Sequence, residues 1–214
     1  MGNRIFRGML LTFALALSSA ASAAPVYLNE SLISVSVGSG TTATTSNNTF
    51  NNGQTINKVI DAPSADAEEI HNQTTHIWFS GGGLELLFDF NQEYNISTLH
   101  FWNYTGETYD VDNIDFTFFD SSSTQVGSLS IMPALGSSPG IEAEDIPLAA
   151  PLNVQFVTAF LTGTNDQVDF QNIGFTAEAS TPQIPSAVPL PAGLPLMLSG
   201  LLGIGFLVRR KKTD

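Results

Sequence analysis

Alternation of apolar and polar residues, the period of a half-buried β-strand, recurs through the middle of the chain. Residues 84–90 place leucine or phenylalanine at every even position, with Glu85 and Asp89 between them, and residues 114–118 repeat the pattern. Residues 154–160 form a third run. Such alternation predicts strands with one buried face. We therefore expect an all-β protein in which one phenylalanine of each run is buried on facing strands: Phe88, Phe116 and Phe156.

The segments between these runs are rich in turn-forming residues. Gly81-Gly82-Gly83, residues 120–122 and residues 162–165 each follow or precede an alternating run. The apolar parity shifts at Gln171-Asn172, which predicts a β-bulge there. Short strands joined by such turns are typical of an antiparallel β-sandwich, and we expect one such domain over residues 24–180.

The start of the chain has the layout of a secretory signal peptide. Arg4 and Arg7 form a positive n-region, residues 9–17 are apolar, and Ala21-Ser22-Ala23 supplies a small-x-small cleavage site. The apolar run is too short to span a bilayer. We expect residues 1–23 to be removed when the protein is exported.

A second apolar run, residues 191–208, lies near the C-terminus. At ~1.5 Å per residue it would span ~27 Å as a helix, which is about the thickness of a bilayer core. A proline-containing linker, residues 181–187, and the motif Val188-Pro189-Leu190-Pro191-Ala192 precede it. Four cations follow it and favour a cytoplasmic end: Arg209, Arg210, Lys211 and Lys212. The pattern predicts a transmembrane helix.

The motif, the apolar helix and the basic tail, over residues 188–214, resemble the PEP-CTERM family of bacterial sorting signals in its VPLPA form. The commoner form has Glu where Leu190 stands. The resemblance implies recognition by an exosortase, a membrane-embedded protease/transpeptidase of Gram-negative bacteria that removes the helix. It also implies an inner-membrane anchor before processing, then a place at the cell surface or in the extracellular matrix. An ordinary C-terminal anchor is the alternative interpretation.

The charge of residues 24–180, the body of the protein, limits the classes of partner that it can bind. Every acidic residue except Asp214 lies in residues 24–180, and Lys58 is the one Lys or Arg of that segment. Such a surface repels nucleic acid and anionic lipid, and it either confers solubility or attracts divalent cations. The chain has no cysteine, which excludes disulfides, thiol catalysis and cysteine metal ligands.

The order of elements over residues 31–178 is similar to that of discoidin-type, galactose-binding-like jelly rolls. The similarity rests on Asp61 after the first strand and loop, on Trp78 before the run of residues 84–90, and on a strand ending in aromatic residues near Tyr104. It implies a mostly non-enzymatic module that binds glycans or membranes through loops at one end. Two departures are Ala62, where the family has Gly, and the missing basic residues that usually hold its ligands.

Catalytic candidates are few. The chain has three histidines, His71, His76 and His100, and lacks a Gly-x-Ser-x-Gly elbow. We expect His100 on the outward face of its strand. No pair of carboxylates stands out for glycoside hydrolysis. We therefore assign no catalytic residue and expect no enzyme, with an exported glycan hydrolase as the alternative.

Acidic residues near the two ends of the domain are candidates for a metal. The cluster at residues 110–115 lacks the residues that an EF-hand requires. Jelly rolls of this type often carry a structural Ca²⁺, and the expected ligands here are Asp61, Asp66 and Glu178. The alternative is that these carboxylates are simply solvated.

The expected ligand-binding residues lie around the end of one strand. Leu99 and Phe101 are expected to face the core. Trp102 and Tyr104, at the alternating positions, are then expected to face away from it, near a polar loop. Aromatic faces and carboxylates suit neutral or cation-bridged polysaccharides. The expected site is Trp102, Tyr104, Glu107 and Asp110, whereas Trp78 is assigned to the core. The sequence thus predicts an exported glycan-binding or structural protein of exopolysaccharide or biofilm.

Overall fold

The computed structural model describes residues 24–42, 50, 53–72 and 75–180. The predicted signal peptide, linker, sorting motif and transmembrane helix lie outside these residues and stay predictions. Within the described ranges, no helix combines the length and the hydrophobicity that crossing a bilayer requires.

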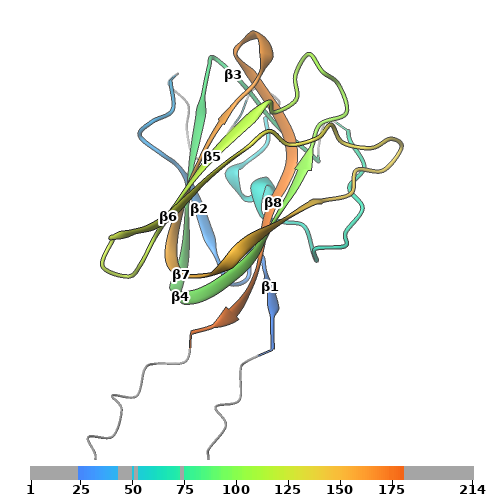
Figure 1. Ribbon diagram of the computed structural model, residues 1–214. Helices are drawn as coiled ribbons and strands as arrows, with labels where there is room; N and C mark the ends of the chain where they lie inside the picture. Colours follow the sequence, from blue (N-terminus) through green and yellow to red (C-terminus); the bar gives the residue numbers. More distant parts are fainter. Residues whose placement is uncertain (1–23, 43–49, 51–52, 73–74, 181–214) are drawn as a thin grey trace, which may run out of the picture. The chain divides into compact units, whose positions relative to one another are not determined.

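Strands dominate the described residues, and the two helices among them are single 3₁₀ turns (Figure 1). The strands in chain order are β1 (Val26–Leu28), β2 (Ser34–Val37), β3 (Ile77–Ser80), β4 (Leu84–Asn103), β5 (Asn113–Phe119), β6 (Gln125–Ile131), β7 (Glu144–Thr162) and β8 (Gln167–Ala179). The 3₁₀ turns are η1 (Ile56–Val59) and η2 (Thr164–Asp166). The prediction of an all-β protein is confirmed.

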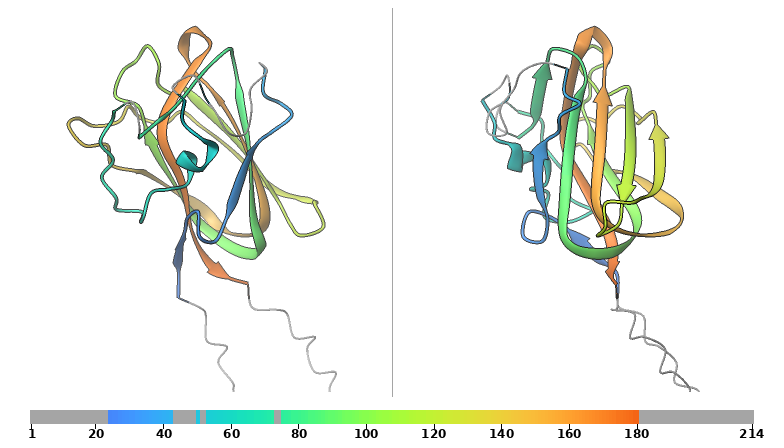
Figure 2. Two further views of the ribbon diagram at one scale, coloured as in Figure 1. Left: turned by 180° about the vertical axis from the view of Figure 1, so that it is seen from behind. Right: turned by 90° about the vertical axis from the view of Figure 1, so that its left-hand side faces the viewer.

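All strand pairs are antiparallel, and they form two layers that share their longest strands. One layer runs from β2 through the first half of β4 to β7, β5 and β6. In the other layer β1 and β3 pair with β8, which pairs with the second half of β4, and that half of β4 also pairs with β7. Figure 2 shows β4 curving from one layer into the other. The antiparallel sandwich is therefore the observed architecture.

The bend in β4 has a local cause. The ladder with β7 is interrupted between Asp89 and Tyr94, and Asn91 adopts a φ of 61°. The Asn91 backbone N–H donates to the Asp89 carboxylate at 2.7 Å, and its side-chain amide donates to the Leu32 carbonyl at 3.0 Å. Asparagine tolerates this left-handed conformation, so the strand can turn here without breaking.

Aromatic side chains from both layers meet in the core. The ring of Phe175 on β8 lies 5.2 Å from Phe88 and 5.0 Å from Phe90, both edge to face. Phe88 and Phe116 are buried, as their alternation predicts, and so are Leu84, Leu86 and Phe90 at the other even positions of the first run. The layers are thus held by a continuous apolar core.

The expected burial of Phe156 is wrong. Phe156 and Phe160 are half-buried, and the core positions of β7 are Val154, Val157, Ala159 and Leu161. The reason is the pairing with β4, because Val157 lies opposite Phe88 and Leu161 opposite Leu84. Residues directly opposite each other share a face, so Val157 and Leu161 lie on the core face together with Phe88 and Leu84.

The β-bulge at Gln171-Asn172 is confirmed. Trp102 pairs with Asn172 and Asn103 pairs with Phe170, so Gln171 is the extra residue of β8. The bulge lets Phe170 and Ile173, an odd number of residues apart, both face the core.

The outer face of β4 and β8 is covered. A second apolar cluster consists of Ala62, Trp102 and Ile141, with Tyr27 and Ala67 packed against it. The loop before β3 and the loop after β6 meet over this face through a bridge between Glu69 and Ile141. His100 is buried here, with Nδ1 2.6 Å from Asp145 and Nε2 2.8 Å from Thr176. His100 thus lies on the outward face of its strand, as expected, but its neighbours on that face bury it.

Candidate functional site

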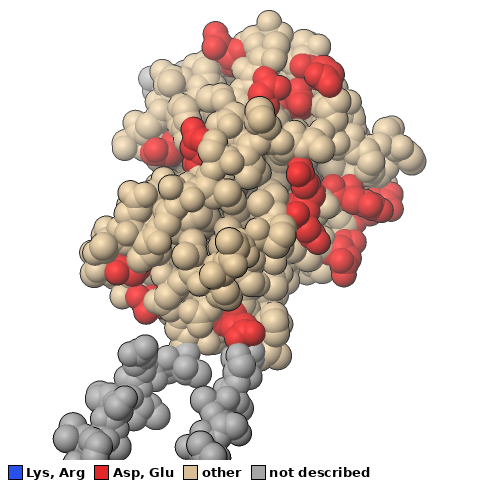
Figure 3. Space-filling view, viewed as in Figure 1, with Lys and Arg blue, Asp and Glu red and all other residues tan. Residues whose placement is uncertain are grey.

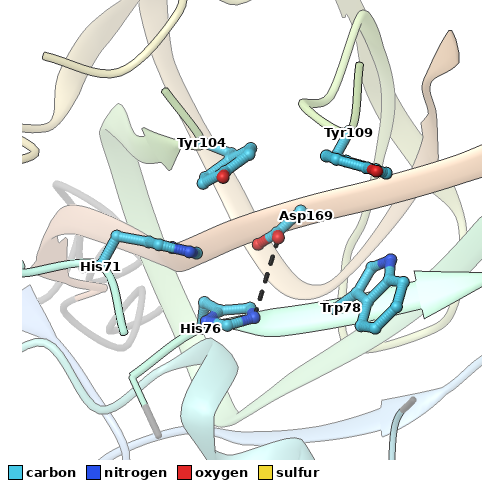
Figure 4. A pocket seen from close by; sticks show the side chains of 6 residues that line it. All are labelled: His71, His76, Trp78, Tyr104, Tyr109 and Asp169. Atoms are coloured by element: carbon cyan, nitrogen blue, oxygen red, sulfur yellow. Dashed lines mark ion pairs between the residues drawn. The ribbon is translucent and has the colours of Figure 1, made fainter. Parts of the chain in front are cut away.

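A pocket of about 220 Å³ opens near the start of β8, where segments distant in sequence come together. Two histidines belong to the loop before β3, one tryptophan to β3, two tyrosines to the loop after β4, and one aspartate to β8. The lining residues are His71, His76, Trp78, Tyr104, Tyr109 and Asp169 (Figure 4).

Strand pairing positions the floor of this pocket. β3 and β8 are antiparallel neighbours in which Trp78 lies directly opposite Asp169. Asp169 stands between the core residues Val168 and Phe170, so it points to the other face of the strand. The bulge at Gln171 then brings its side-chain amide to within 3.0 Å of His71 Nδ1.

Aromatic rings form two walls of the pocket. His71 stacks on His76 with ring centroids 4.3 Å apart, and Tyr104 lies 4.4 Å from His71. Tyr109 meets Trp78 edge to face at 6.4 Å. The Trp78 indole N–H donates to Gln167 at 2.9 Å, which fixes the ring while leaving it half-buried. The pocket thus offers aromatic surface that is held before any ligand arrives.

Asp169 is the polar centre of the pocket. Its carboxylate is buried, and Oδ1 has no hydrogen-bond partner among the described residues. Oδ2 lies 3.7 Å from His76 Nε2, which is too long for a hydrogen bond. Burial raises the pKa of the Asp169 carboxyl to about 8. At neutral pH this carboxyl is therefore largely protonated, and a ligand that brings a positive charge or hydrogen-bond donors would favour its ionised form.

Both pocket histidines favour the neutral form. Burial lowers the pKa of His71, and the neighbouring His76 lowers it further. Burial also lowers the pKa of His76, although a hydrogen bond to the Asn72 backbone partly opposes that shift. At neutral pH each ring therefore presents one N–H donor and one bare nitrogen to the pocket or its surroundings.

Of the four expected ligand-binding residues, Tyr104 alone lines this pocket. Trp102 is fully buried and its indole N–H donates to the Ala67 carbonyl at 2.8 Å, so it offers no face to a ligand. Glu107 is exposed on the loop. Asp110 is buried, and burial raises the pKa of its carboxyl. The alternation of residues along β4 correctly predicts that Trp102 points away from the core. It does not reveal that two loops cover this side chain, and so the predicted site is not formed.

The expected Ca²⁺ ligands are not brought together. Asp61 forms an ion pair with Lys58, and Asp66 lies in a second, acidic pocket beside Glu142 and Asp145. Glu178 lies on β8 opposite Asn95. Within the described ranges, the residues whose ligand atoms gather closely enough for a metal are His71, His76 and Asp169.

Sequence reasoning missed most of the pocket. One signal for it was present, because Asp169 interrupts an apolar strand next to a predicted bulge. The two histidines and Trp78 gave no such signal, since their roles depend on a loop folding back against β8.

Comparison with solved structures identifies the fold. The F5/8 type C domain of a Bacteroides fragilis protein matches 73% of this chain and 98% of its own length, with a TM-score of 0.50 and 8% sequence identity. The family 32 carbohydrate-binding module of C. perfringens NanJ, solved with galactose, matches 72% of this chain and 99% of its own, at a TM-score of 0.45 and 8% identity. A fucose-binding module of Streptococcus pneumoniae, SpX-3, matches 70% and 94%, at 0.44 and 13%. The match to the F5/8 type C domain shows that the chain has a discoidin-like fold.

No protein-family model matches the sequence. No curated protein matches it either.

Proposed function

We propose that this protein binds neutral glycans, without catalysis, through the pocket around Trp78 and Asp169. The observation that carries the proposal is the combination of fixed aromatic surface with one buried, unpartnered carboxylate oxygen. Sugar rings present apolar C–H faces that pack on aromatic rings, and their hydroxyl groups can donate to such an oxygen. Trp78 and Tyr109 would supply the faces, and Asp169 would accept a hydroxyl hydrogen bond.

The size and charge of the pocket support a small, uncharged ligand segment. Its volume of about 220 Å³ lies below the ~300–1,000 Å³ of pockets for drug-sized molecules. The residues that line the pocket include no Lys or Arg. Lys58, the one Lys or Arg of residues 24–180, forms an ion pair with Asp61. Acidic side chains are spread over the face shown in Figure 3. Since the body is acidic and the pocket lining holds no Lys or Arg, anionic glycans would meet repulsion, so one or two neutral sugar units are the better ligand.

The alternative of a glycan hydrolase requires a second carboxylate facing the first across a cleft. Asp169 is the one carboxylate among the residues that line this pocket, and the remaining polar groups are imidazoles and phenols. The pocket therefore supports binding better than hydrolysis.

The proposal includes export and sorting. The signal peptide of residues 1–23 and the exosortase signal of residues 188–214 would place the body at the cell surface or in the extracellular matrix of a Gram-negative bacterium. The position of the pocket suits this arrangement. Asp169 and Ala177 are separated by about 26 Å of strand along β8, and Ala177 lies beside Val26. The pocket is thus far from both ends of the described body, which would leave it accessible on a tethered protein.

A glycan array followed by isothermal titration tests the binding proposal. The protein should bind neutral glycans, and Trp78→Ala and Tyr109→Ala should each weaken binding at least tenfold. Met132→Ala, a change at an exposed apolar side chain outside the pocket, is the matched control and should bind normally. Unchanged affinity in both aromatic variants would contradict this site.

A further inference from the structure

The polar side of the pocket has the donor set of a metal site. One ligand atom from each of His71, His76 and Asp169 lies within 4.8 Å of the other two. The histidines come from the loop before β3 and the aspartate from β8, and Figure 4 shows the three side chains converging. His76 and Asp169 are buried. Two imidazoles and one carboxylate are the ligands of many zinc and non-haem iron sites.

The hydrogen bonds of His76 orient it as a metal ligand. Its Nδ1 lies 2.6 Å from the Asn72 backbone carbonyl, which can only accept, so Nδ1 carries the hydrogen in the neutral ring. Nε2 is then the unprotonated ring nitrogen, and it faces Asp169 Oδ2 at 3.7 Å. A tetrahedral ion with bonds of about 2.0–2.2 Å holds such atoms about 3.4 Å apart. A shift of a few tenths of an ångström would therefore let one ion bind both atoms.

His71 has a hydrogen-bonding partner of the kind that orients metal-binding histidines. Gln171 places its amide 3.0 Å from His71 Nδ1, and the other polar atom of that amide is buried with no partner among the described residues. The oxygen and nitrogen of an amide are distinguished only by their hydrogen bonds. With the oxygen toward His71, Gln171 would accept from Nδ1–H and leave Nε2 bare for a metal.

An independent observation points to a cation. Asp169 Oδ1 is buried without a hydrogen-bond partner among the described residues, although it belongs to a carboxylate that strand β8 holds in the pocket. An ionised carboxylate that is buried without a hydrogen bond or a counter-charge destabilises a fold. A bound cation would stabilise the ionised form of Asp169.

We propose that His71, His76 and Asp169 bind one divalent transition-metal ion, with Zn²⁺ as the best fit. Ca²⁺ fits poorly because it takes six to eight oxygen ligands, whereas two of the three donors here are nitrogens. With three protein ligands, the ion keeps an open position toward Trp78 and Tyr109, which water or a ligand hydroxyl would fill. This inference does not rest on the glycan proposal, since the three donors are present whether or not a sugar binds.

The test uses the full-length protein in detergent, stripped with a chelator. Isothermal titration with ZnCl₂ should show one ion per chain, and the melting temperature should rise with micromolar Zn²⁺ but not with millimolar Ca²⁺ or Mg²⁺. Co²⁺ should give the visible absorption of a low-coordinate site with nitrogen ligands. Binding of several weak ions, or equal responses to Zn²⁺ and Ca²⁺, would overturn the proposal.

Variants separate this site from other causes of zinc binding. Asp169→Asn and His71→Gln should each weaken Zn²⁺ binding by more than about 100-fold. Substituting a residue that only hydrogen-bonds to a metal ligand typically weakens binding by about 10–100-fold. Asp169→Asn should melt no lower than the wild type in chelator, because it replaces a buried carboxyl that has an unpartnered oxygen with a neutral amide of the same shape. Asp166→Asn, in the turn just before β8, is the control and should bind Zn²⁺ normally. Zinc affinity unchanged by Asp169→Asn would contradict the site.

Two further variants distinguish this inference from the glycan proposal. Trp78→Ala should lose glycan binding and keep Zn²⁺ binding, because Trp78 supplies no ligand atom. Gln171→Ala should weaken Zn²⁺ binding by about 10–100-fold through His71. Loss of zinc binding in Trp78→Ala, with the fold intact, would count against the ligand set.

Discussion

The indole N–H of Trp102 donates a hydrogen bond to the backbone carbonyl of Ala67 at 2.8 Å. This bond ties the outer face of β4 to the loop that carries His71. Trp102 is therefore a structural residue that holds one wall of the pocket in place, and its expected role in ligand binding passes to Trp78.

Loss of this bond should destabilise the protein. Trp102→Phe keeps an aromatic ring but leaves the Ala67 carbonyl without its donor, so we expect the free energy of unfolding to fall by about 1–3 kcal/mol. Urea denaturation followed by circular dichroism measures it. Trp78→Phe is the matched control, and it should cost less because solvent reaches the half-buried side chain. Equal costs for the two variants would contradict the structural role of Trp102.

The register of β7 can be tested by paired truncations. Phe88→Ala removes a fully buried ring and should lower the free energy of unfolding by about 3–5 kcal/mol. Phe156→Ala removes a half-buried ring of the opposite parity and should cost clearly less. Thermal and urea unfolding give both values. A larger loss for Phe156→Ala than for Phe88→Ala would contradict the β7 register and place Phe156 in the core.

Asp110 should make stability fall as pH rises. Burial, followed by the charges of Asp112 and Glu107, raises the pKa of this carboxyl in the folded state above its ordinary value of 3.8. The folded state then binds more protons than the unfolded state between those two pKa values, so the free energy of unfolding decreases with pH in that window.

Asp110→Asn measures this effect. The variant should be more stable than the wild type above the folded-state pKa, and the difference should vanish below pH 3.8, where both forms are neutral. Asp115→Asn, an exposed acid on β5, controls for the loss of one negative charge. Chemical denaturation at several pH values gives the comparison. An advantage of Asp110→Asn that does not change with pH would exclude this linkage.

Processing can be checked by mass spectrometry of material from the cell surface of the producing bacterium. The mature protein should begin at Ala24, because Ala21-Ser22-Ala23 is the predicted signal peptidase site. It should also lack the apolar helix, since exosortase recognition of residues 188–192 implies removal of the C-terminal segment beyond them. Recovery of an intact peptide across residues 200–212 would reduce the C-terminus to an ordinary anchor.

The sequence by itself determined the elements whose cause is local. The alternation of residues 84–90 and 114–118 predicted which side chains enter the core, because the strand period of two leaves one buried face. The parity change at Gln171-Asn172 predicted the bulge for the same reason. For residues 154–160 the rule failed, because apolar residues occur at both parities there, and pairing with β4 selected Val157 rather than Phe156.

Only the tertiary structure decided what covers the outer face of the sheet. Alternation shows that His100 and Trp102 point away from the core. The sequence of a strand, however, does not indicate which other segments pack over its outer face. The loop before β3 packs on Trp102 and delivers His71 and His76 to Asp169 on β8, whereas Tyr27, Asp145 and Thr176 surround His100. The candidate site therefore could not be predicted from the sequence, because it depends on contacts between segments that no local pattern connects.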